Sequence, residues 1–252
     1  MVIDMKELLE VMDKLLSPEG CPWDREQTHE SLTRYMIEET YETIDAIKEN
    51  DMDKLREELG DLLLQVVFHS KLAENKSFFT FDDVVKTVTE KMISRHPHVF
   101  SNMNLSTSDD VMQNWEEFKK KEGKKTTLEG IPNTLPALMR AEKMQTKASR
   151  VGFDWPDVNG AVEKVIEEAK ELSQANNEDE IIEETGDLLF AVVNIARMKN
   201  VDPEKALQRC NDKFLRRFNY IEQKIKANGN SLTDATLQDM DFLWDEAKTN
   251  GL

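Results

Sequence analysis

The chain consists of long stretches in which apolar residues recur three and four positions apart, with Glu and Lys between them. This spacing is the period of an α-helix that buries one face. Glycine and proline are scarce, with 9 and 7 in 252 residues, and they fall mainly where these stretches end. Since both residues interrupt helices, the pattern predicts about ten helices and no strand, which is an all-α fold.

Two runs, residues 62–68 and 188–193, are apolar at nearly every position and would also fit buried strands. The acidic residues before them and the lack of turn signals favour helices that are buried on most faces. Gly60 and Gly186 fall inside these helices, where glycine costs about 1 kcal/mol relative to alanine. Their repetition predicts a close approach of two helices, or is a by-product of duplication.

Helix boundaries are predicted from caps and breakers. In the first half we expect a helix over residues 2–16, a loop over 17–24, two acidic helices, a helix that starts at Thr80–Asp83 and ends before Pro97, and one that starts at Ser108 and contains Trp115. In the second half we expect a helix to about Arg150, a loop with Trp155, two acidic helices, a basic helix opened by Asp202–Pro203, and a last helix with Trp244.

The two halves repeat one another. The pattern E-E-x-x-E occurs at 38–42 and 167–171, and E-E-x-G-D-L-L occurs at 57–63 and 183–189. Further along each half, a Lys and an Arg occur four residues apart, namely Lys91/Arg95 in the first half and Lys213/Arg217 in the second. A Trp and a Lys four residues apart come after them, namely Trp115/Lys119 and Trp244/Lys248. This order predicts a tandem duplication of a four-helix-bundle-like unit, with domains at 1–123 and 135–252 and a polar linker at 124–134.

The acidic patterns predict a metal site in each half. Residues three apart share a helix face, so two helices would each present a pair of carboxylates, which need a positive charge between them. Mg²⁺, with Mn²⁺ as a possible substitute, prefers such oxygen ligands and accepts phosphate oxygens as well. The candidate ligands are Glu168, Glu171, Glu184 and Asp187 in the second half, and Glu39, Glu42, Glu58 and Asp61 in the first. A solvated acidic face is the alternative for each pattern taken alone.

A basic pair on one face of the next helix predicts phosphate contacts. Lys213 and Arg217 would meet one polyphosphate, and surface ion pairing is the alternative. Trp244 would stack on a base or lie in the core, and Lys248 would add charge. Asn194 follows Asp187 by seven residues, where the first half has Phe68. A buried Asn side chain needs a hydrogen-bond partner. We therefore expect Asn194 to bind the edge of a base or a sugar, or to make a structural hydrogen bond within the protein.

Composition excludes several classes of function. A net charge of −17 disfavours nucleic acid and anionic membranes as partners, and no apolar run is long enough to span a bilayer. No signal peptide is evident. Cys21 and Cys210 lie in different halves of the chain, and we expect both to be reduced thiols. Both observations predict a cytoplasmic protein. The sequence shows no zinc spacing and no glycine-rich phosphate loop, and its acidic helices lack the Glu-x-x-His of di-iron bundles.

Several longer motifs extend this pattern. They are Gly20–Asp24, Arg95–Phe100, Leu135–Leu138, Val151–Trp155 and the two acidic pairs. With these motifs the whole chain resembles the MazG family of nucleoside triphosphate pyrophosphohydrolases, part of the all-α NTP pyrophosphatase group. The resemblance implies Mg²⁺-dependent hydrolysis of nucleoside triphosphates between the α and β phosphates, a broad NTP and dNTP range, a homodimer built by helix packing, and a C-terminal half that is the main catalytic one.

The resemblance also implies roles for individual residues. Glu168, Glu171, Glu184 and Asp187 match the metal ligands. The segments Lys164–Glu168, Glu180–Glu183 and Lys213–Arg217, together with Trp244, match the substrate-binding positions. Glu180 departs from the basic residue that relatives can carry there, whereas the first half has Lys54. Apart from the resemblance, Glu167 precedes the first of these ligands by one residue and is therefore a candidate general base or an outer partner of the ligands.

Two other functions remain open on the sequence. One is a dedicated pyrophosphatase for dUTP or modified nucleotides. The other is a non-catalytic helical nucleotide sensor or scaffold, which the acidic surface and the duplication permit. A scaffold has no need for four carboxylates in both halves.

Overall fold

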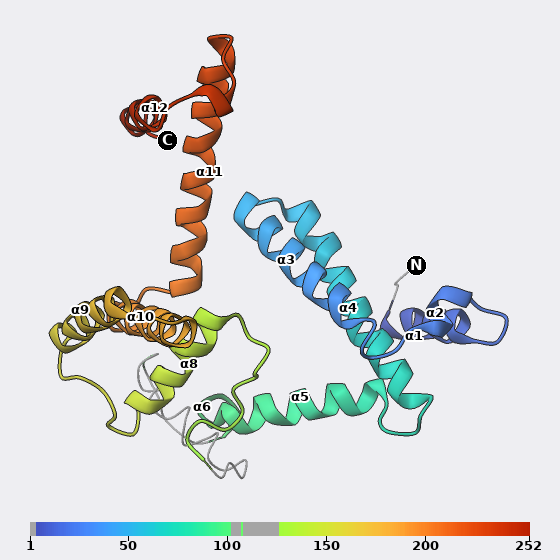
Figure 1. Cartoon of the computed structure of the whole chain (residues 1–252). Coiled ribbons are helices and arrows are strands. Elements are labelled where there is room, and N and C mark those ends of the chain that lie inside the picture. Colours follow the sequence, from blue (N-terminus) through green and yellow to red (C-terminus); the bar gives the residue numbers. More distant parts are fainter. Residues whose placement is uncertain (1–3, 102–106, 108–125) are drawn as a thin grey trace. The chain divides into compact units, whose positions relative to one another are not determined.

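The structure is a computed structural model that describes residues 4–101, 107 and 126–252. These residues form helices and no strand, and their contacts divide the chain into two units, 1–122 and 123–252 (Figure 1). The all-α prediction is therefore confirmed, and the two ambiguous apolar runs lie inside long helices. The predicted helix with Trp115 and Lys119 falls outside the described residues.

Unit 1 contains α1 (Met5–Leu16), α2 (Pro22–Glu26), α3 (Thr33–Glu49), α4 (Met52–Glu74), α5 (Phe81–Arg95) and α6 (Pro97–Phe100). Unit 2 contains α8 (Ala137–Ser149), α9 (Val158–Gln174), α10 (Glu178–Met198), α11 (Pro203–Ala227), a 3₁₀ turn η1 (Leu232–Asp234) and α12 (Leu237–Thr249). Within the described ranges, no helix has the length and apolar composition needed to cross a membrane.

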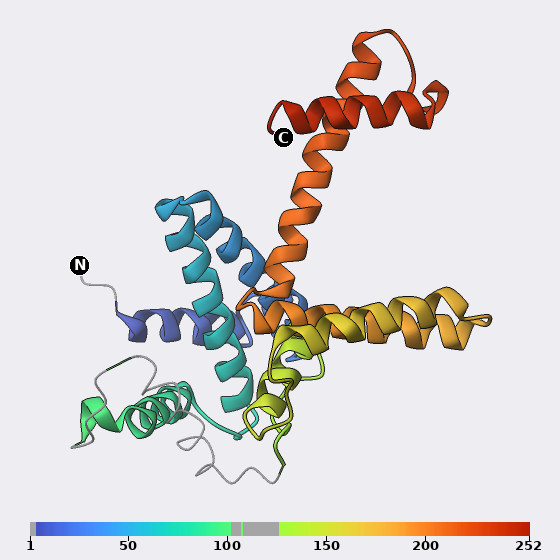
Figure 2. The same cartoon turned by 90° about the vertical axis from the view of Figure 1, so that its left-hand side faces the viewer.

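Each unit is built on a helical hairpin. The helices α3 and α4 pack along one another, as do α9 and α10, and Figures 1 and 2 show both pairs side by side. Tight turns set this geometry. Asn50 ends α3 in the left-handed conformation, with a φ of 55°, and the side chain of Asp51 accepts from two backbone N–H groups at the start of α4. Asn177 caps α10 by accepting from the N–H of Glu180.

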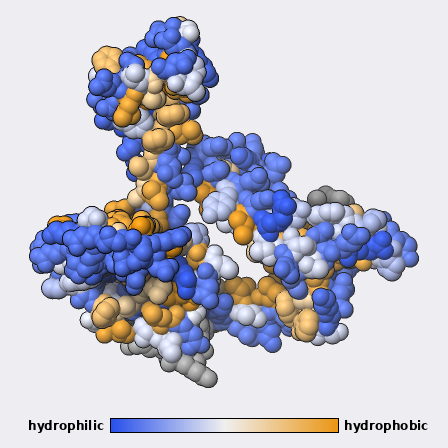
Figure 3. All heavy atoms as spheres, viewed as in Figure 1, coloured by the Kyte–Doolittle hydropathy of each residue, from blue (hydrophilic) through white to orange (hydrophobic). Residues whose placement is uncertain are grey.

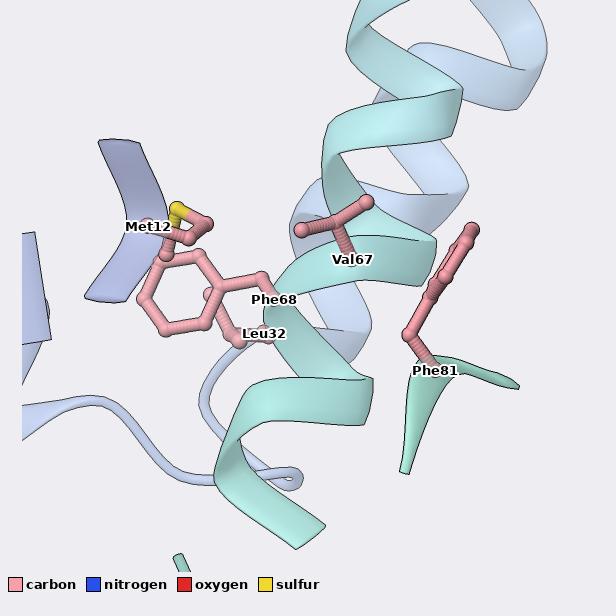
Figure 4. Close-up of a cluster of buried hydrophobic side chains, with 5 residues drawn as sticks. All are labelled: Met12, Leu32, Val67, Phe68 and Phe81. Carbon is pink, nitrogen blue, oxygen red and sulfur yellow. The ribbon is translucent and has the colours of Figure 1, made fainter. Parts of the chain in front are cut away.

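A flanking helix closes one side of each hairpin, with α1 packing on α4 and α8 on α10. In unit 1 the core contains Met12, Leu32, Val67, Phe68 and Phe81 (Figure 4). The Phe68 ring lies against Met12 and Leu32, so aromatic and aliphatic side chains fill the space between α1 and α4. Burial of these side chains is the main stabilising contribution in this unit.

The helix caps expected from the sequence are present at two starts. Thr80 and Asp83 form a reciprocal capping box on α5, and Asp202 caps α11, which has Pro203 in its first turn. One other prediction was wrong. Residues 22–24, expected in a loop, belong to α2, which Pro22 begins. Of the two explanations for the repeated glycines, the structure excludes the first: a Cβ added at Gly60 or Gly186 would meet nothing within 4 Å, so neither glycine permits a close approach to another described helix, and duplication is left as the explanation.

Candidate functional site

The acidic residues of α9 and α10 form a compact cluster. Carboxylate oxygens of Glu168, Glu184 and Asp187 lie within 4.8 Å of one another, and so do those of Glu167, Glu168 and Glu171. The pairing of α9 with α10 places one carboxylate pair against the other, as the spacing of the two motifs predicted. Glu168 is the centre of the cluster and is 3% exposed.

Lys164 lies one turn before Glu168 and neutralises part of this charge. Its Nζ lies 2.5 Å from a carboxylate oxygen of Glu168 and 2.9 Å from one of Glu167. These hydrogen bonds raise the pKa of Lys164, and the one to Glu168 holds the pKa of that carboxyl below its usual range. Glu168 therefore stays ionised in the middle of the cluster.

The remaining carboxyls of the cluster respond in the opposite direction. Burial, followed by the hydrogen bond and the charge of Glu168, raises the pKa of Glu171. Burial, followed by the charges of Glu171 and Glu168, raises the pKa of Glu184. Burial and repulsion disfavour the charged form of a carboxyl. The cluster thus holds more negative charge than one ammonium group offsets.

The donor set fits a hard divalent cation. All candidate ligands are carboxylates, and Oε2 of Glu184 is buried without a hydrogen-bond partner in the described part of the chain. An oxygen in this condition needs a proton or a cation. Mg²⁺ and Mn²⁺ prefer oxygen ligands of this kind.

A cavity of about 700 Å³ adjoins the cluster, with Lys164, Glu168 and Asp187 at its edge. Its apolar wall includes Met144, Ala148, Phe153, Trp155, Phe190 and Ala191, and its other polar lining residues are Gln145, Asp154, Asn194 and Arg197. Trp155 can lie against α9 because residue 160 is glycine, where a Cβ would come within 2.2 Å of the indole. An apolar cavity with a few fixed polar groups is typical of small-molecule sites.

The basic pair expected to meet phosphate lies on α11 and does not line the cavity. Arg217 donates from Nε to the backbone oxygen of Leu252, and its guanidinium lies 5.4 Å from the Trp244 ring. Trp244 packs against Phe214, Lys213 is exposed, and Lys248 pairs with Asp245 at 2.8 Å. The structure thus places Arg217 beside Trp244, whereas Lys213 is exposed, and neither residue lines the cavity that adjoins the acidic cluster.

The other predicted contacts near the hairpin turn have local partners or face solvent. Glu180 accepts a hydrogen bond from the N–H of Asn176, and Glu183 is exposed. Neither residue lines the cavity.

The N-terminal unit repeats the carboxylate cluster. Glu39, Glu58 and Asp61 have oxygens within 4.8 Å of one another, and Glu42 is among the carboxylates whose charge raises the pKa of Glu39. Burial first, and neighbouring carboxylates second, raise the pKa values of Glu39 and Glu58.

Sequence reasoning singled out Asn194 but missed several residues that line the cavity. Phe153, Asp154 and Trp155 were noted only as part of a motif, and that motif was the available signal. Gln145 and Arg197 gave none, because an isolated Gln or Arg in a helical pattern resembles a solvated position.

A duplicated helical hairpin with a carboxylate cluster beside a cavity of this size has the architecture of an all-α nucleotide hydrolase. The model of the MazG nucleotide pyrophosphohydrolase domain matches residues 27–100 and 158–221. The chain belongs to this family, and the match to both halves confirms the predicted tandem duplication.

The similarity to two known proteins extends over nearly the whole chain. The nucleoside triphosphate pyrophosphohydrolase/pyrophosphatase MazG of Thermotoga maritima is 48% identical over 246 residues, which cover 96% of this chain and 95% of that protein. The nucleoside triphosphate pyrophosphohydrolase of Escherichia coli strain K12 is 43% identical over 251 residues, with 96% and 95% covered. The crystal structure of a mazG-related protein from Thermotoga maritima covers 46% of this chain and 99% of that one, with 28% identity and a TM-score of 0.41.

Proposed function

We propose that this protein hydrolyses nucleoside triphosphates between the α and β phosphates, releasing a nucleoside monophosphate and pyrophosphate, over a broad NTP and dNTP range. Such an activity would serve nucleotide-pool housecleaning or regulation in the cytoplasm. The observation that carries the proposal is the carboxylate cluster at the edge of the C-terminal cavity. The cavity has room for a nucleoside, and the cluster lies where a triphosphate would emerge from it. The activity in the names of the relatives supports the same reaction.

Mg²⁺ is the proposed cofactor, and Glu168, Glu171, Glu184 and Asp187 would hold it. It would supply the positive charge that offsets the phosphate oxygens. Glu168 is suited to this role because its bond to Lys164 keeps it ionised. Glu167 is half-exposed beside Lys164, where it can accept a proton from the attacking water or orient a neighbouring ligand. Water attacks phosphorus, the α–β bridging P–O bond breaks, and pyrophosphate leaves.

We also propose that the protein acts as a homodimer. Helix α11 exposes Leu207, Phe214, Leu215 and Phe218, and Figure 3 shows apolar side chains along it. Among the described residues of unit 2, the buried apolar side chains are those of three alanines (Ala161, Ala191 and Ala247) and of Val193, Ile221 and Ile225. The core of this unit therefore contains few large side chains. Exposed apolar patches of this kind mark association surfaces. A second copy would cover this face and could bring Lys213, Arg217 and Trp244 to a triphosphate.

The test is pyrophosphate release in Mg²⁺ from a panel of NTPs and dNTPs including dUTP. We expect Glu168→Ala, Glu184→Ala and Asp187→Ala each to reduce release by at least a hundredfold, because each removes a metal ligand. The matched variants Glu39→Ala, Glu58→Ala and Asp61→Ala should retain most of it.

Undiminished release by the C-terminal variants would sink the assignment to that unit. Turnover of dUTP alone would favour a dedicated housecleaning enzyme. Binding of NTPs without any turnover by the wild type would favour a sensor.

A further inference from the structure

The C-terminal cavity is lined by a buried oxygen atom that accepts no hydrogen bond from the described residues. Gln145 on α8 is 7% exposed, and its Nε2 donates to the backbone oxygen of Phe190 at 2.8 Å. This bond fixes the amide so that Oε1 is the free end. Oε1 is buried and accepts no hydrogen bond from the described residues. An unsatisfied buried acceptor costs about 1–3 kcal/mol, so a ligand N–H would be favoured here.

Asn194 on α10 lies in the same cavity wall, four residues after Phe190, and is 6% exposed. Its Oδ1 accepts from Nε and Nη2 of Arg197 at 3.0 and 2.7 Å. Arg197 is itself held by Asp154, at 2.6 Å from Nη2. Because both bonds occupy the carbonyl end, the Asn194 amide nitrogen is left as a donor, and within the described ranges no acceptor engages it.

Together these two side chains offer an acceptor and a donor in one cavity that has aromatic walls. Nucleobases present adjacent N–H donors and ring or carbonyl acceptors on one edge, and their faces stack on aromatic rings. A ribose, by contrast, has hydroxyls and no flat face. The arrangement therefore matches a base better than a sugar.

We propose that Gln145 and Asn194 read the hydrogen-bonding edge of the substrate's nucleobase, with Gln145 Oε1 accepting from a base N–H and Asn194 Nδ2 donating to a base acceptor. This inference rests on the proposed function and adds the residues that set base selectivity. Arg197 and Asp154 are positioning residues, since they act by holding the Asn194 amide. Phe153, Trp155 and Phe190 supply the surfaces on which the base stacks.

The N-terminal unit provides an internal comparison. Asp13 corresponds to Gln145, because each lies ten residues before the tryptophan of its unit, Trp23 or Trp155. Lys71 corresponds to Arg197, because each lies ten residues after the aspartate of the second acidic motif, Asp61 or Asp187. Lys71 pairs with Asp13 at 2.8 Å, so these two positions satisfy one another. Phe68 replaces Asn194 and is 4% exposed in the core. The base-reading subsite is therefore confined to the C-terminal unit.

The experiment measures kcat/KM for ATP, GTP, CTP, UTP and ribose 5-triphosphate, which lacks a base. Gln145→Leu removes the acceptor at similar volume, and Asn194→Asp replaces the donor with an acceptor. We expect each variant to lose about tenfold or more on at least one NTP, mainly through KM. The losses should differ between bases, and ribose 5-triphosphate should be unaffected. Asp13→Asn, at the matching N-terminal position, should leave the base profile unchanged.

Equal losses on all five substrates, or an unchanged base profile, would overturn the inference. Equilibrium binding of non-hydrolysable α,β-methylene NTPs to the same variants separates it from the proposed function. If the wild type binds these analogues but releases no pyrophosphate from the natural NTPs, the proposed function fails. A base-dependent loss of affinity in the variants would then still support the subsite, and equal affinities would still overturn it.

Discussion

At the scale of single residues, the C-terminal site is defined by a charge imbalance. One ammonium group, that of Lys164, pairs with the carboxylates of Glu167 and Glu168. The carboxylates of Glu171, Glu184 and Asp187 also lie close to Glu168. The pKa of Glu184 is raised by burial and then by Glu171 and Glu168. Its stability contribution is therefore present below the unfolded-state value of 4.5 and is lost as pH rises through the higher folded-state value.

This sign predicts a pH-dependent effect of Glu184→Gln on the metal-free protein. In EDTA at pH 7.5 the variant should have a higher Tm than the wild type, because it removes a buried, repelled charge. The difference should shrink as the pH falls toward 4.5. Mg²⁺ should raise the Tm of the wild type and have little effect on the variant.

Thermal unfolding followed by circular dichroism at several pH values measures this. Glu183→Gln, at the exposed neighbouring position, is the matched control and should show neither effect. A Tm difference that does not change with pH would contradict the account of the cluster.

At the scale of elements, the sequence predicted the helices better than it predicted their surroundings. The apolar spacing and the caps at Thr80 and Asp202 identified α5 and α11 because these signals are local. Residues 22–24 were misjudged because a proline in a loop-like segment can also begin a short helix. The sequence left two explanations open for the mid-helix glycines, because the sequence alone does not show which helix face has a neighbour.

The same glycines give a prediction about helix stability. Alanine at Gly186 should stabilise α10 by about 0.5–1 kcal/mol, since a Cβ there meets no described atom and alanine restricts the unfolded chain. Urea unfolding measures the change, and Gly60→Ala is the equivalent substitution in α4. Gly160→Ala is the contrasting control and should destabilise, because its Cβ would collide with Trp155. Loss of stability at Gly186 would show that something packs there.

The candidate site shows the same limit. The carboxylates of the cluster were predictable because helical period and repetition place them on facing helices. The cavity was not, because it depends on α8 and on the loop before α9 packing against α10. Gln145 acquires a role only through the carbonyl of Phe190, which is 45 residues away. Contacts of this kind leave no periodic signal.

At the scale of the whole molecule, the exposed apolar face of α11 predicts assembly. Phe214 and Leu215 are 56% and 59% exposed, and burying such side chains is worth about 1.5–3 kcal/mol each. Leu215→Glu should therefore shift the protein from dimer to monomer in sedimentation velocity. Gln223→Glu, an exposed polar position on the same helix, should not. A wild type that is monomeric at micromolar concentration would contradict the proposed dimer.

The N-terminal unit has a filled core, in which Phe68 lies against Met12 and Leu32, and an ion pair between Lys71 and Asp13, and this has an evolutionary consequence. After a gene duplicates, one copy is released from selection for ligand binding and can accumulate substitutions that improve packing. A binding cavity lowers stability, and truncating a buried Phe commonly costs about 3–5 kcal/mol. The N-terminal unit, which has packed side chains where the C-terminal unit has an open cavity, should therefore be the more stable of the two when each is considered by itself.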